Sequence, residues 1–347
     1  MMRYFITALA GVSLLLALGG CRHEQPDTPE AAMDATLAAL ETDTDFTLLA
    51  ETADGTQYRF SRGSSTAETE YRSASTSKMV AAAVILALVE DGVLSLDDHP
   101  QDYLAFWPEQ GSHGDIQLRH LLSFTSGLNV TPLCISNPFA DFAGCVATVL
   151  ERNPDIDAPG TGFYYASTHL QVAGLMAVRA AGVSGWGEVF DYFRARTGLF
   201  PSAAFDLPSS DNPRIAGGMH WRAEEYLGFL RALYQGEVLS PALLTQMTSD
   251  QLQGAPILYS PVADAPLELD WHYGFGLWIE CAAVPFDCPE TTRVSSAGAY
   301  GAYPFIDIER RYFGIVAREG SLATGHEGYQ VWASVAQPMA EWAAAHQ

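Results

Sequence analysis

Basic residues are scarce in this chain of 347 residues, and lysine is almost absent. Lysine and arginine together number 18 against 41 acidic residues, which gives a net charge of −23. A protein with this charge is repelled by nucleic acid and by anionic lipid headgroups. The acidic residues are dispersed along the chain, which indicates a solvated surface rather than a binding device. We therefore expect no nucleic-acid partner and no electrostatic attachment to a membrane.

Several familiar catalytic and metal-binding motifs are also missing. No serine has glycine both two positions before and two positions after it, and neither H-E-x-x-H nor C-x-x-C occurs. These absences argue against the nucleophile elbow of α/β-hydrolases, the helical zinc-protease motif and the usual zinc–thiolate spacing. The nine histidines are scattered, so we expect neither a metal nor a cofactor. Four of them are expected to be structural residues rather than ligands, namely His120, His169, His220 and His272.

The N-terminus carries a hydrophobic run of the kind that directs export. Arg3 precedes an apolar stretch, Phe5 to Leu18, that contains no acidic residue and is followed by Gly19-Gly20-Cys21. The stretch is short for a membrane span, and its composition is typical of a cleaved signal. A cysteine directly after small residues resembles the bacterial lipoprotein signal, so we expect residues 1–20 to be removed and Cys21 to be acylated. A plain secretory signal is the alternative.

The residues after Cys21 predict where the folded protein begins and where it resides. Arg22 stands where an aspartate would resemble an inner-membrane retention mark, which favours a lipid anchor in the outer membrane, facing the periplasm. Residues 21–33 are polar and contain proline, so we interpret them as a flexible tether. A single folded domain is then expected over residues 34–347.

Four cysteines remain once Cys21 is set aside. An even number in an exported protein favours disulfides over free thiols. Three pairings are possible, and the short separations favour Cys134 with Cys145 and Cys281 with Cys288. Each bond would then close one loop.

Hydrophobic patterns predict a mixed α+β fold. Strands are expected at 46–50 and 57–60, joined by the turn Ala53-Asp54-Gly55, and again at 273–279, 298–305 and 312–316. The interior of the chain is mainly helical. We therefore expect an antiparallel sheet completed by both ends of the chain, flanked by helices, with an inserted helical region. The predicted helices cover residues 31–40, 73–90, 169–182, 222–235 and 330–345.

Lys78 is the only lysine, and it lies three residues after Ser75. On a helix these two positions share a face, so the hydroxyl and the amine can meet. A buried lysine can lose its proton near neutral pH, whereas arginine stays charged. Replacement of lysine by arginine can also be a compositional bias, so the spacing alone is a weak signal. The pair nevertheless suggests a serine nucleophile activated by a neutral amine.

The surrounding motifs resemble the serine β-lactamase and penicillin-binding protein superfamily. The closest branch holds class C β-lactamases, D-stereospecific peptidases and related esterases. Ser75-x-x-Lys78 matches its S-x-x-K motif at the start of a buried helix. The family's LLxHTSGL stretch has its counterpart at 121–128, with Phe124 in place of the histidine and an expected structural role. The resemblance extends from about residue 34 to the end of the chain.

The resemblance also implies the rest of the site. The family's Y-x-N motif falls on Tyr165-Ala166-Ser167, with serine in place of asparagine. Its strand motif K-T-G or H-x-G falls on Ser296-Ala297-Gly298. Tyr165 is then expected to accept or relay the serine proton, and the backbone N–H of Ala299 is expected to form an oxyanion hole with that of Ser75.

These motifs predict a serine hydrolase that forms an acyl-enzyme on esters or amides. Ser167 and Ser296 replace side chains that contact β-lactams in the family, which favours an esterase or D-peptidase-like activity over an efficient β-lactamase. Trp221, Trp271 and Trp278 are candidates for an apolar acyl pocket, although core positions suit them equally. We expect a monomer that acts on a small-molecule ester, amide or peptide. The alternative is a catalytically inactive envelope lipoprotein that binds peptidoglycan-like ligands.

Overall fold

The computed structural model describes residues 28–322 and 324–347. The predicted signal peptide and the acylated Cys21 lie outside these residues. The first helix, α1 (Pro29–Ala39), begins inside the stretch 21–33 that was interpreted as a tether, and Met33 within it is fully buried. Residues 29–33 therefore belong to a packed helix rather than to a tether, because Met33 and Leu37 give α1 an apolar side that packs on α11 (Ala336–Ala345).

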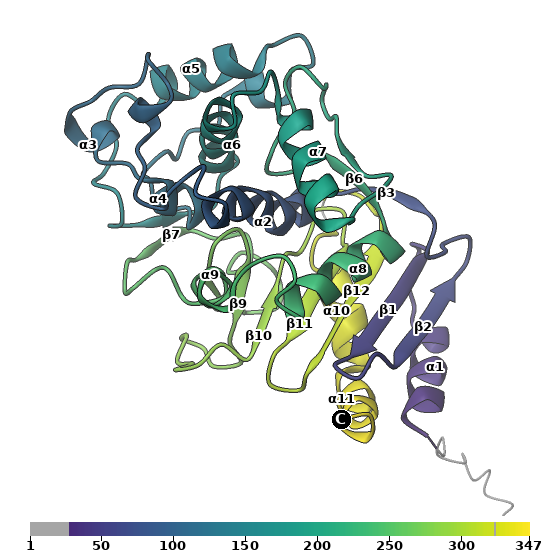
Figure 1. Ribbon diagram of the computed structural model, residues 1–347. Helices are drawn as coiled ribbons and strands as arrows, with labels where there is room; N and C mark the ends of the chain where they lie inside the picture. The colour runs from purple at the N-terminus through teal and green to yellow at the C-terminus, as the bar shows by residue number, and fades with distance from the viewer. Residues whose placement is uncertain (1–27, 323) are drawn as a thin grey trace, which may run out of the picture.

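A seven-stranded antiparallel sheet forms one half of the molecule, with the strand order β2-β1-β12-β11-β10-β9-β8. The first strand of the chain, β1, pairs along its length with the last, β12, as Figure 1 shows for the purple and yellow-green arrows. Both ends of the chain thus complete the sheet, as predicted. The strands are β1 (Phe46–Thr52), β2 (Gln57–Arg62), β8 (His272–Tyr273), β9 (Trp278–Glu280), β10 (Arg293–Ser295), β11 (Tyr303–Asp307) and β12 (Tyr312–Arg318).

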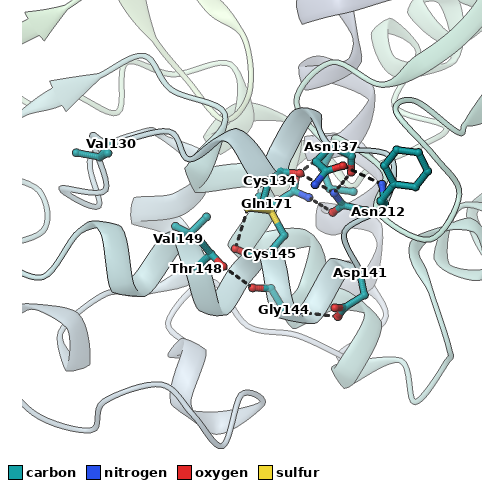
Figure 2. Close-up of a disulfide and its surroundings, with 12 residues drawn as sticks. Val130, Cys134, Asn137, Asp141, Gly144, Cys145, Thr148, Val149, Gln171 and Asn212 are labelled. Carbon is teal, nitrogen blue, oxygen red and sulfur yellow. Dashed lines mark hydrogen bonds between the residues drawn. A yellow bond between two sulfur atoms is a disulfide. The ribbon is translucent and has the colours of Figure 1, made fainter.

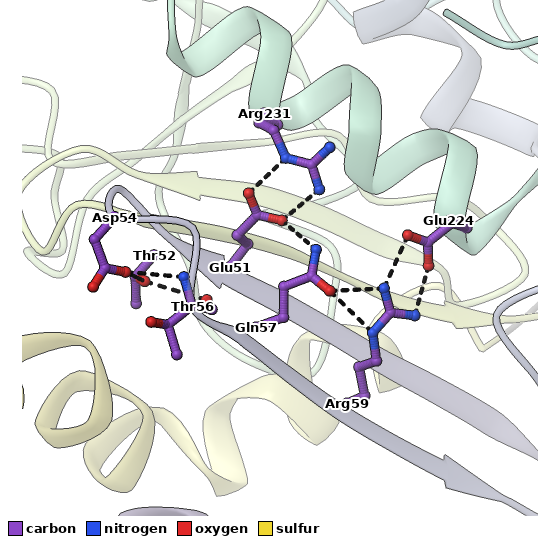
Figure 3. Close-up of polar contacts among 8 residues, drawn as sticks. All are labelled: Glu51, Thr52, Asp54, Thr56, Gln57, Arg59, Glu224 and Arg231. Atoms are coloured by element: carbon purple, nitrogen blue, oxygen red, sulfur yellow. Dashed lines mark hydrogen bonds and ion pairs between the residues drawn. The ribbon is translucent and has the colours of Figure 1, made fainter. Parts of the chain in front are cut away.

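Helices cover both faces of this sheet. Helix α8 (Ala223–Tyr234) lies over β1 and β12, and α10 (Glu327–Ser334) contacts β12 beside α1 and α11. Figure 3 shows the contact between α8 and β1 in detail. There the buried carboxylate of Glu51 accepts hydrogen bonds from Arg231 of α8, while Arg59 of β2 pairs with Glu224 nearer the surface.

The inserted region forms the other half, and α2 (Ser77–Glu90) runs between the two halves. Its side chains from Ser77 to Leu88 are all buried, as a helix that is apolar nearly all round requires. Helices α6 and α7 pack against it. The remaining helices are α3 (Gly111–Gly114), α4 (Leu118–Leu122), α5 (Phe142–Arg152), α6 (Thr168–Ala180), α7 (Trp186–Thr197) and α9 (Pro241–Met247), with 3₁₀ turns η1 (Ala74–Thr76), η2 (Pro100–Asp102) and η3 (Leu133–Ser136).

Two minor sheets complete the fold. One has the order β3-β6-β5 and ties the segment before α2 to the inserted region, and the other is a parallel pair, β4 with β7. Their strands are β3 (Glu70–Arg72), β4 (Phe163–Tyr164), β5 (Ala204–Phe205), β6 (Met219–Arg222) and β7 (Ile257–Tyr259).

Two predicted elements are divided in the structure, and a third is shortened. The strand expected over 273–279 is a hairpin of β8 and β9, because Gly274 packs against the Met247 carbonyl and Gly276 turns the chain at φ 71°. The strand expected over 298–305 begins only at Tyr303, after a turn closed by the Gly301 N–H and the Gly298 carbonyl. The final helix is interrupted at Val335, between α10 and α11.

Both predicted disulfides are present, with S–S distances of 2.07 Å for Cys134–Cys145 and 1.97 Å for Cys281–Cys288. Figure 2 shows the first of these, which joins η3 to α5. The side-chain amide of Asn212 donates to the carbonyls of Cys134 and Asn137, so the stapled loop is also fastened to a segment far along the chain. No helix among the described residues has the length and apolar character needed to cross a bilayer.

Candidate active site

Ser75 lies in the short 3₁₀ turn η1, directly before α2. Its neighbour Ala74 has φ 44°, a left-handed conformation that costs a non-glycine residue about 1–3 kcal/mol and is held only by strong surroundings. Those surroundings include the Ser73 N–H, which donates to the Met219 carbonyl at 2.8 Å. They also include the Tyr226 hydroxyl, which donates to the Thr76 carbonyl at 2.8 Å. The turn that presents Ser75 is therefore fixed on both sides.

The amine of Lys78 meets the Ser75 hydroxyl, as the spacing predicts. Lys78 Nζ lies 2.8 Å from Ser75 Oγ and 2.8 Å from the carbonyl oxygen of Ala216, and the side chain is 3% exposed. Burial lowers the pKa of Lys78 to about 7, and the positive charge of Arg214 acts in the same direction. A substantial fraction of the amine is thus neutral at neutral pH.

Tyr165 lines the same cavity as Ser75 and Lys78. Its ring stacks on Trp278 with centroids 5.0 Å apart, and Lys78 Nζ lies 4.7 Å from its centroid. Enclosure raises the pKa of Tyr165 well above its ordinary range, and the contact with the Ser75 side chain offsets only part of this effect. The phenol therefore keeps its proton at neutral pH, where it can donate a hydrogen bond or relay a proton.

The stretch expected to form a substrate-binding strand is a loop between β10 and β11, and its residues divide into two groups. Ala297, Gly298 and Ala299 line the same cavity as Ser75. Ser296 does not; its hydroxyl donates to the Ser75 carbonyl at 2.9 Å. Instead of the predicted contact with substrate, Ser296 makes a contact with the main chain of Ser75. Gly298 is required because a Cβ there would lie 2.8 Å from the Ser73 carbonyl.

A cavity of about 530 Å³ opens above Ser75. Ser167 lines it, as expected, and so do Trp271 and Trp278. Trp221 does not line it, because its buried ring instead donates an N–H to Thr76 Oγ1. Much of the wall was not predicted from the sequence, because it comes from the end of β7, from the loop that follows it and from the start of α10. These wall residues include Tyr259, Val262, Asp264, Leu267, Leu269, His326 and Tyr329.

The other candidate residues have structural roles. Phe124 is fully buried and stacks on His169 at 4.8 Å, and His169 is held by the Ser126 hydroxyl and the Tyr164 carbonyl. His220 and His272 each contact an aspartate, and His120 accepts from the Gln117 N–H. Within residues 28–322 and 324–347, no group of three or more histidine, cysteine or acidic side chains is placed to hold a metal ion.

Known structures share this architecture. A candidate β-lactamase from Bacteroides dorei DSM 17855 is 28% identical, covers 80% of this chain and 85% of its own, and superposes with a TM-score of 0.70. The octameric penicillin-binding protein homologue from Pyrococcus abyssi is 19% identical over 88% of this chain and 75% of its own, with a TM-score of 0.68. EstCE1, a hydrolase with promiscuous acyltransferase activity, is 19% identical over 88% and 97%, also with a TM-score of 0.68.

Two comparisons at the level of sequence gave different results. No curated protein sequence matches the chain. The family model described as Beta-lactamase matches residues 47–328, which include Ser75, Lys78 and Tyr165. Since this match spans most of the chain, and the fold agrees with it, the protein belongs to the β-lactamase family.

Proposed function

We propose that this protein is a serine hydrolase that transfers the acyl group of an ester or amide to Ser75 and then to water. One observation carries the proposal: a buried lysine amine whose pKa lies at about 7 stands 2.8 Å from the Ser75 hydroxyl. General-base catalysis is most efficient when the pKa of the base lies near the working pH. An amine in this environment can take the hydroxyl proton without prior ionisation of the serine.

In the proposed acylation step, Ser75 Oγ attacks the substrate carbonyl carbon while its proton passes to Lys78 Nζ. The Ala216 carbonyl and the face of the Tyr165 ring both stabilise the ammonium ion that results. The proton then moves to the leaving group as the carbon–heteroatom bond breaks, and neutral Tyr165 is placed to relay it. In deacylation, water attacks the carbonyl carbon of the acyl-enzyme ester while its proton passes to Lys78 Nζ. That proton then moves to Ser75 Oγ as the bond between the acyl group and Oγ breaks, which releases the carboxylic acid and restores the free serine.

The negative charge that develops on the oxygen of the tetrahedral intermediate requires hydrogen-bond donors that are fixed before the reaction. We expect the backbone N–H groups of Ser75 and Ala299 to supply them, because both residues line the cavity. The direction of α2 supports this arrangement, since Ser75 precedes the N-terminal, positive end of that helix.

The walls of the cavity favour a neutral, apolar acyl group. Val262, Leu269, Trp271 and Trp278 offer carbon surface, and the only lysine is already occupied beside Ser75. No arginine lines the cavity among the described residues, so the wall offers no guanidinium to a substrate carboxylate. An ester with an apolar acyl chain therefore suits the site better than an anionic β-lactam.

A fluorophosphonate probe tests the proposal, because it labels only activated serine nucleophiles. We expect one label per chain, located at Ser75 by peptide mass spectrometry and absent from the Ser75→Ala variant. A folded, unlabelled wild-type protein would reject the enzyme and leave the inactive, ligand-binding lipoprotein as the better account. For a labelled protein, p-nitrophenyl esters, D-amino-acid amides and a chromogenic cephalosporin then rank the substrate classes, and we expect the esters to be hydrolysed fastest.

We further propose that the protein is anchored to the bacterial outer membrane through a lipid on Cys21. The support is the sequence Leu18-Gly19-Gly20-Cys21 after an apolar run. Cys21→Ser should release the protein from the membrane fraction and abolish incorporation of radiolabelled palmitate. Retention of the variant on membranes would contradict the anchor.

A further inference from the structure

We propose that Arg214 is a positioning residue for the acyl transfer at Ser75: its guanidinium group packs on the turn that receives the Lys78 amine and places an unpaired positive charge there. Arg214 is not among the residues that line the catalytic cavity, so it acts through Lys78 rather than on the substrate. The consequence for catalysis rests on the proposed function. The ionisation of the amine, however, can be measured whether or not Ser75 reacts.

The turn 214–218 contains the carbonyl that binds the lysine. The Arg214 carbonyl closes this turn by accepting from the N–H groups of Gly217 and Gly218, at 3.0 Å and 2.6 Å. Ala216 lies inside the turn, and its carbonyl accepts from Lys78 Nζ at 2.8 Å. Arg214 therefore stands two residues from the group that orients the amine, in the same closed turn.

The Arg214 side chain folds back over this turn toward the nucleophile. Its Nη2 donates to the Gly217 carbonyl at 3.4 Å, and a Cβ on Gly217 would lie 3.2 Å from its Nε. The same Cβ would lie 3.5 Å from the carbonyl oxygen of Ala74, the residue directly before Ser75. The absence of a side chain at Gly217 thus lets the guanidinium group approach the turn that presents the nucleophile.

No carboxylate neutralises the charge of Arg214. Within the described part of the chain it forms no ion pair with an acidic residue. Its Nη1 donates to the Ser136 hydroxyl at 3.4 Å, and its buried Nε has no hydrogen-bond partner among residues 28–322 and 324–347. A positive charge without a counter-ion disfavours protonation of a nearby amine. The lowered pKa of Lys78 agrees with this, since Arg214 contributes to it after burial.

Contacts from α6 hold the main chain around Arg214. Gln171 is fully buried, and its side chain donates to the Pro213 carbonyl at 3.0 Å and accepts from the Ile215 N–H at 3.2 Å. Figure 2 shows this side chain beside Asn212. Because the main chain is fixed on both sides of Arg214, a substitution there should change the local charge without unfolding the segment.

Other ionisable groups face the amine from several elements. The Tyr165 ring lies 4.7 Å from Lys78 Nζ, and burial lowers the pKa of His169 on α6 to about 4, so neither adds a positive charge at pH 7. On α2 itself, the only other charged side chain is Glu90, at the far end of the helix. All these groups are shared by the wild type and the Arg214 variants, so a difference between the proteins reports the arginine. The ionisable side chains of the cavity wall, which are also shared, are Tyr259, Asp264, His326 and Tyr329.

The test uses the fact that Lys78 is the only lysine of the chain. Intact protein made with ¹³Cε-labelled lysine gives one lysine NMR signal, whose chemical shift follows the ionisation of the amine. Arg214→Gln removes the charge and keeps an amide donor, and Arg214→Met is a second uncharged variant without a donor. Arg179→Gln is the matched control, because it removes one exposed arginine elsewhere. Circular dichroism checks that each variant folds.

We expect the NMR midpoint of Lys78 to rise by about 0.5 to 1 pH unit in Arg214→Gln and Arg214→Met. This is less than the effect of a charge in direct contact, because Arg214 is partly exposed. The pH midpoint of Ser75 labelling should rise equally, and Arg214→Lys should restore it. Arg179→Gln should move neither midpoint by more than about 0.2 unit, because solvent and salt screen distant charges.

An NMR midpoint that stays at the wild-type value in the folded Arg214 variants would overturn the proposal, even if the maximal rate of labelling falls. An equal shift in Arg179→Gln would also overturn it, because the effect would then follow net charge alone. A shift confined to the Arg214 variants, in a protein whose wild-type Ser75 is not labelled, would support the action of Arg214 on the amine and reject only the acyl transfer.

Discussion

The amine of Lys78 donates to the backbone carbonyl of Ala216 at 2.8 Å, across 138 positions of sequence. A neutral amine has two N–H bonds and one lone pair, so a fixed acceptor for one N–H helps to orient the lone pair. Ser75 Oγ lies 2.8 Å from the same nitrogen. In the proposed mechanism the carbonyl thus orients the lone pair of Lys78 toward Ser75, and it would also stabilise the ammonium ion after proton transfer.

Lys78→Arg should abolish acylation while keeping the positive charge. A guanidinium does not lose its proton in proteins, so it cannot accept one from Ser75. We expect the rate of fluorophosphonate labelling to fall by about 10²- to 10⁴-fold, the usual contribution of a general base. Circular dichroism would confirm that the variant folds. Labelling at the wild-type rate by a folded variant would refute the role of the neutral amine.

Lys78→Met should stabilise the protein, and the gain should depend on pH. Burial lowers the pKa of Lys78 from 10.5 to about 7, so between these values the unfolded chain binds more protons than the folded one. The wild-type free energy of unfolding therefore rises with pH across this window, by several kcal/mol at about 1.4 kcal/mol per pKa unit. Urea titrations of both proteins should therefore show a smaller difference in the free energy of unfolding between Lys78→Met and the wild type at pH 10 than at pH 7. A constant difference would mean that the amine is not desolvated.

Tyr165→Phe should slow labelling less than Lys78→Arg does. The pKa of Tyr165 is raised by its enclosure, so its hydroxyl serves as a donor or relay rather than as the primary base. Phenylalanine keeps the ring that stacks on Trp278 and faces Lys78. We expect a loss of about 10- to 100-fold, below the range of Lys78→Arg, with the pH midpoint of labelling unchanged. A loss equal to that of Lys78→Arg would assign the base to the tyrosine.

The two arginines in Figure 3, Arg231 and Arg59, should contribute very different amounts to the free energy of unfolding. Arg231 pairs with Glu51, whose side chain is 4% exposed, whereas Arg59 and Glu224 are 44% and 37% exposed. Arg231→Leu leaves a buried carboxylate without its cation and should lower the free energy of unfolding by about 3–5 kcal/mol. Arg59→Leu is the matched control and should cost at most about 1 kcal/mol. Equal losses in denaturant titrations would contradict this ranking.

Contacts between residues that lie close together along the chain are the ones that the sequence predicts best. The contact between Ser75 and Lys78 follows from helical geometry, and both disulfides follow from short separations. The antiparallel sheet completed by both chain ends is also confirmed, and its strands β1 and β12 are mainly apolar runs that are buried along their whole length.

Parts of the site that depend on backbone atoms or loops could not be predicted in this way. The Ala216 carbonyl, which accepts from Lys78, is a backbone group and has no side-chain signature in the sequence. The loop at 296–302 overlaps the strand expected over 298–305, but a hydrogen bond from the Gly301 N–H to the Gly298 carbonyl turns the chain there. Ser296 was expected to face substrate, and only its position beneath Ser75 shows that it binds the main chain.

The pH dependence of Ser75 labelling tests the central claim most directly. Because burial places the pKa of Lys78 at about 7, the reactive, neutral amine forms as the pH rises through that value. The labelling rate should therefore increase with pH, reach half its maximum near pH 7 and level off above about pH 8, with Ser75→Ala unlabelled throughout. A rate that is constant from pH 5 to pH 9, or that continues to rise toward pH 10, would contradict the neutral lysine as the base.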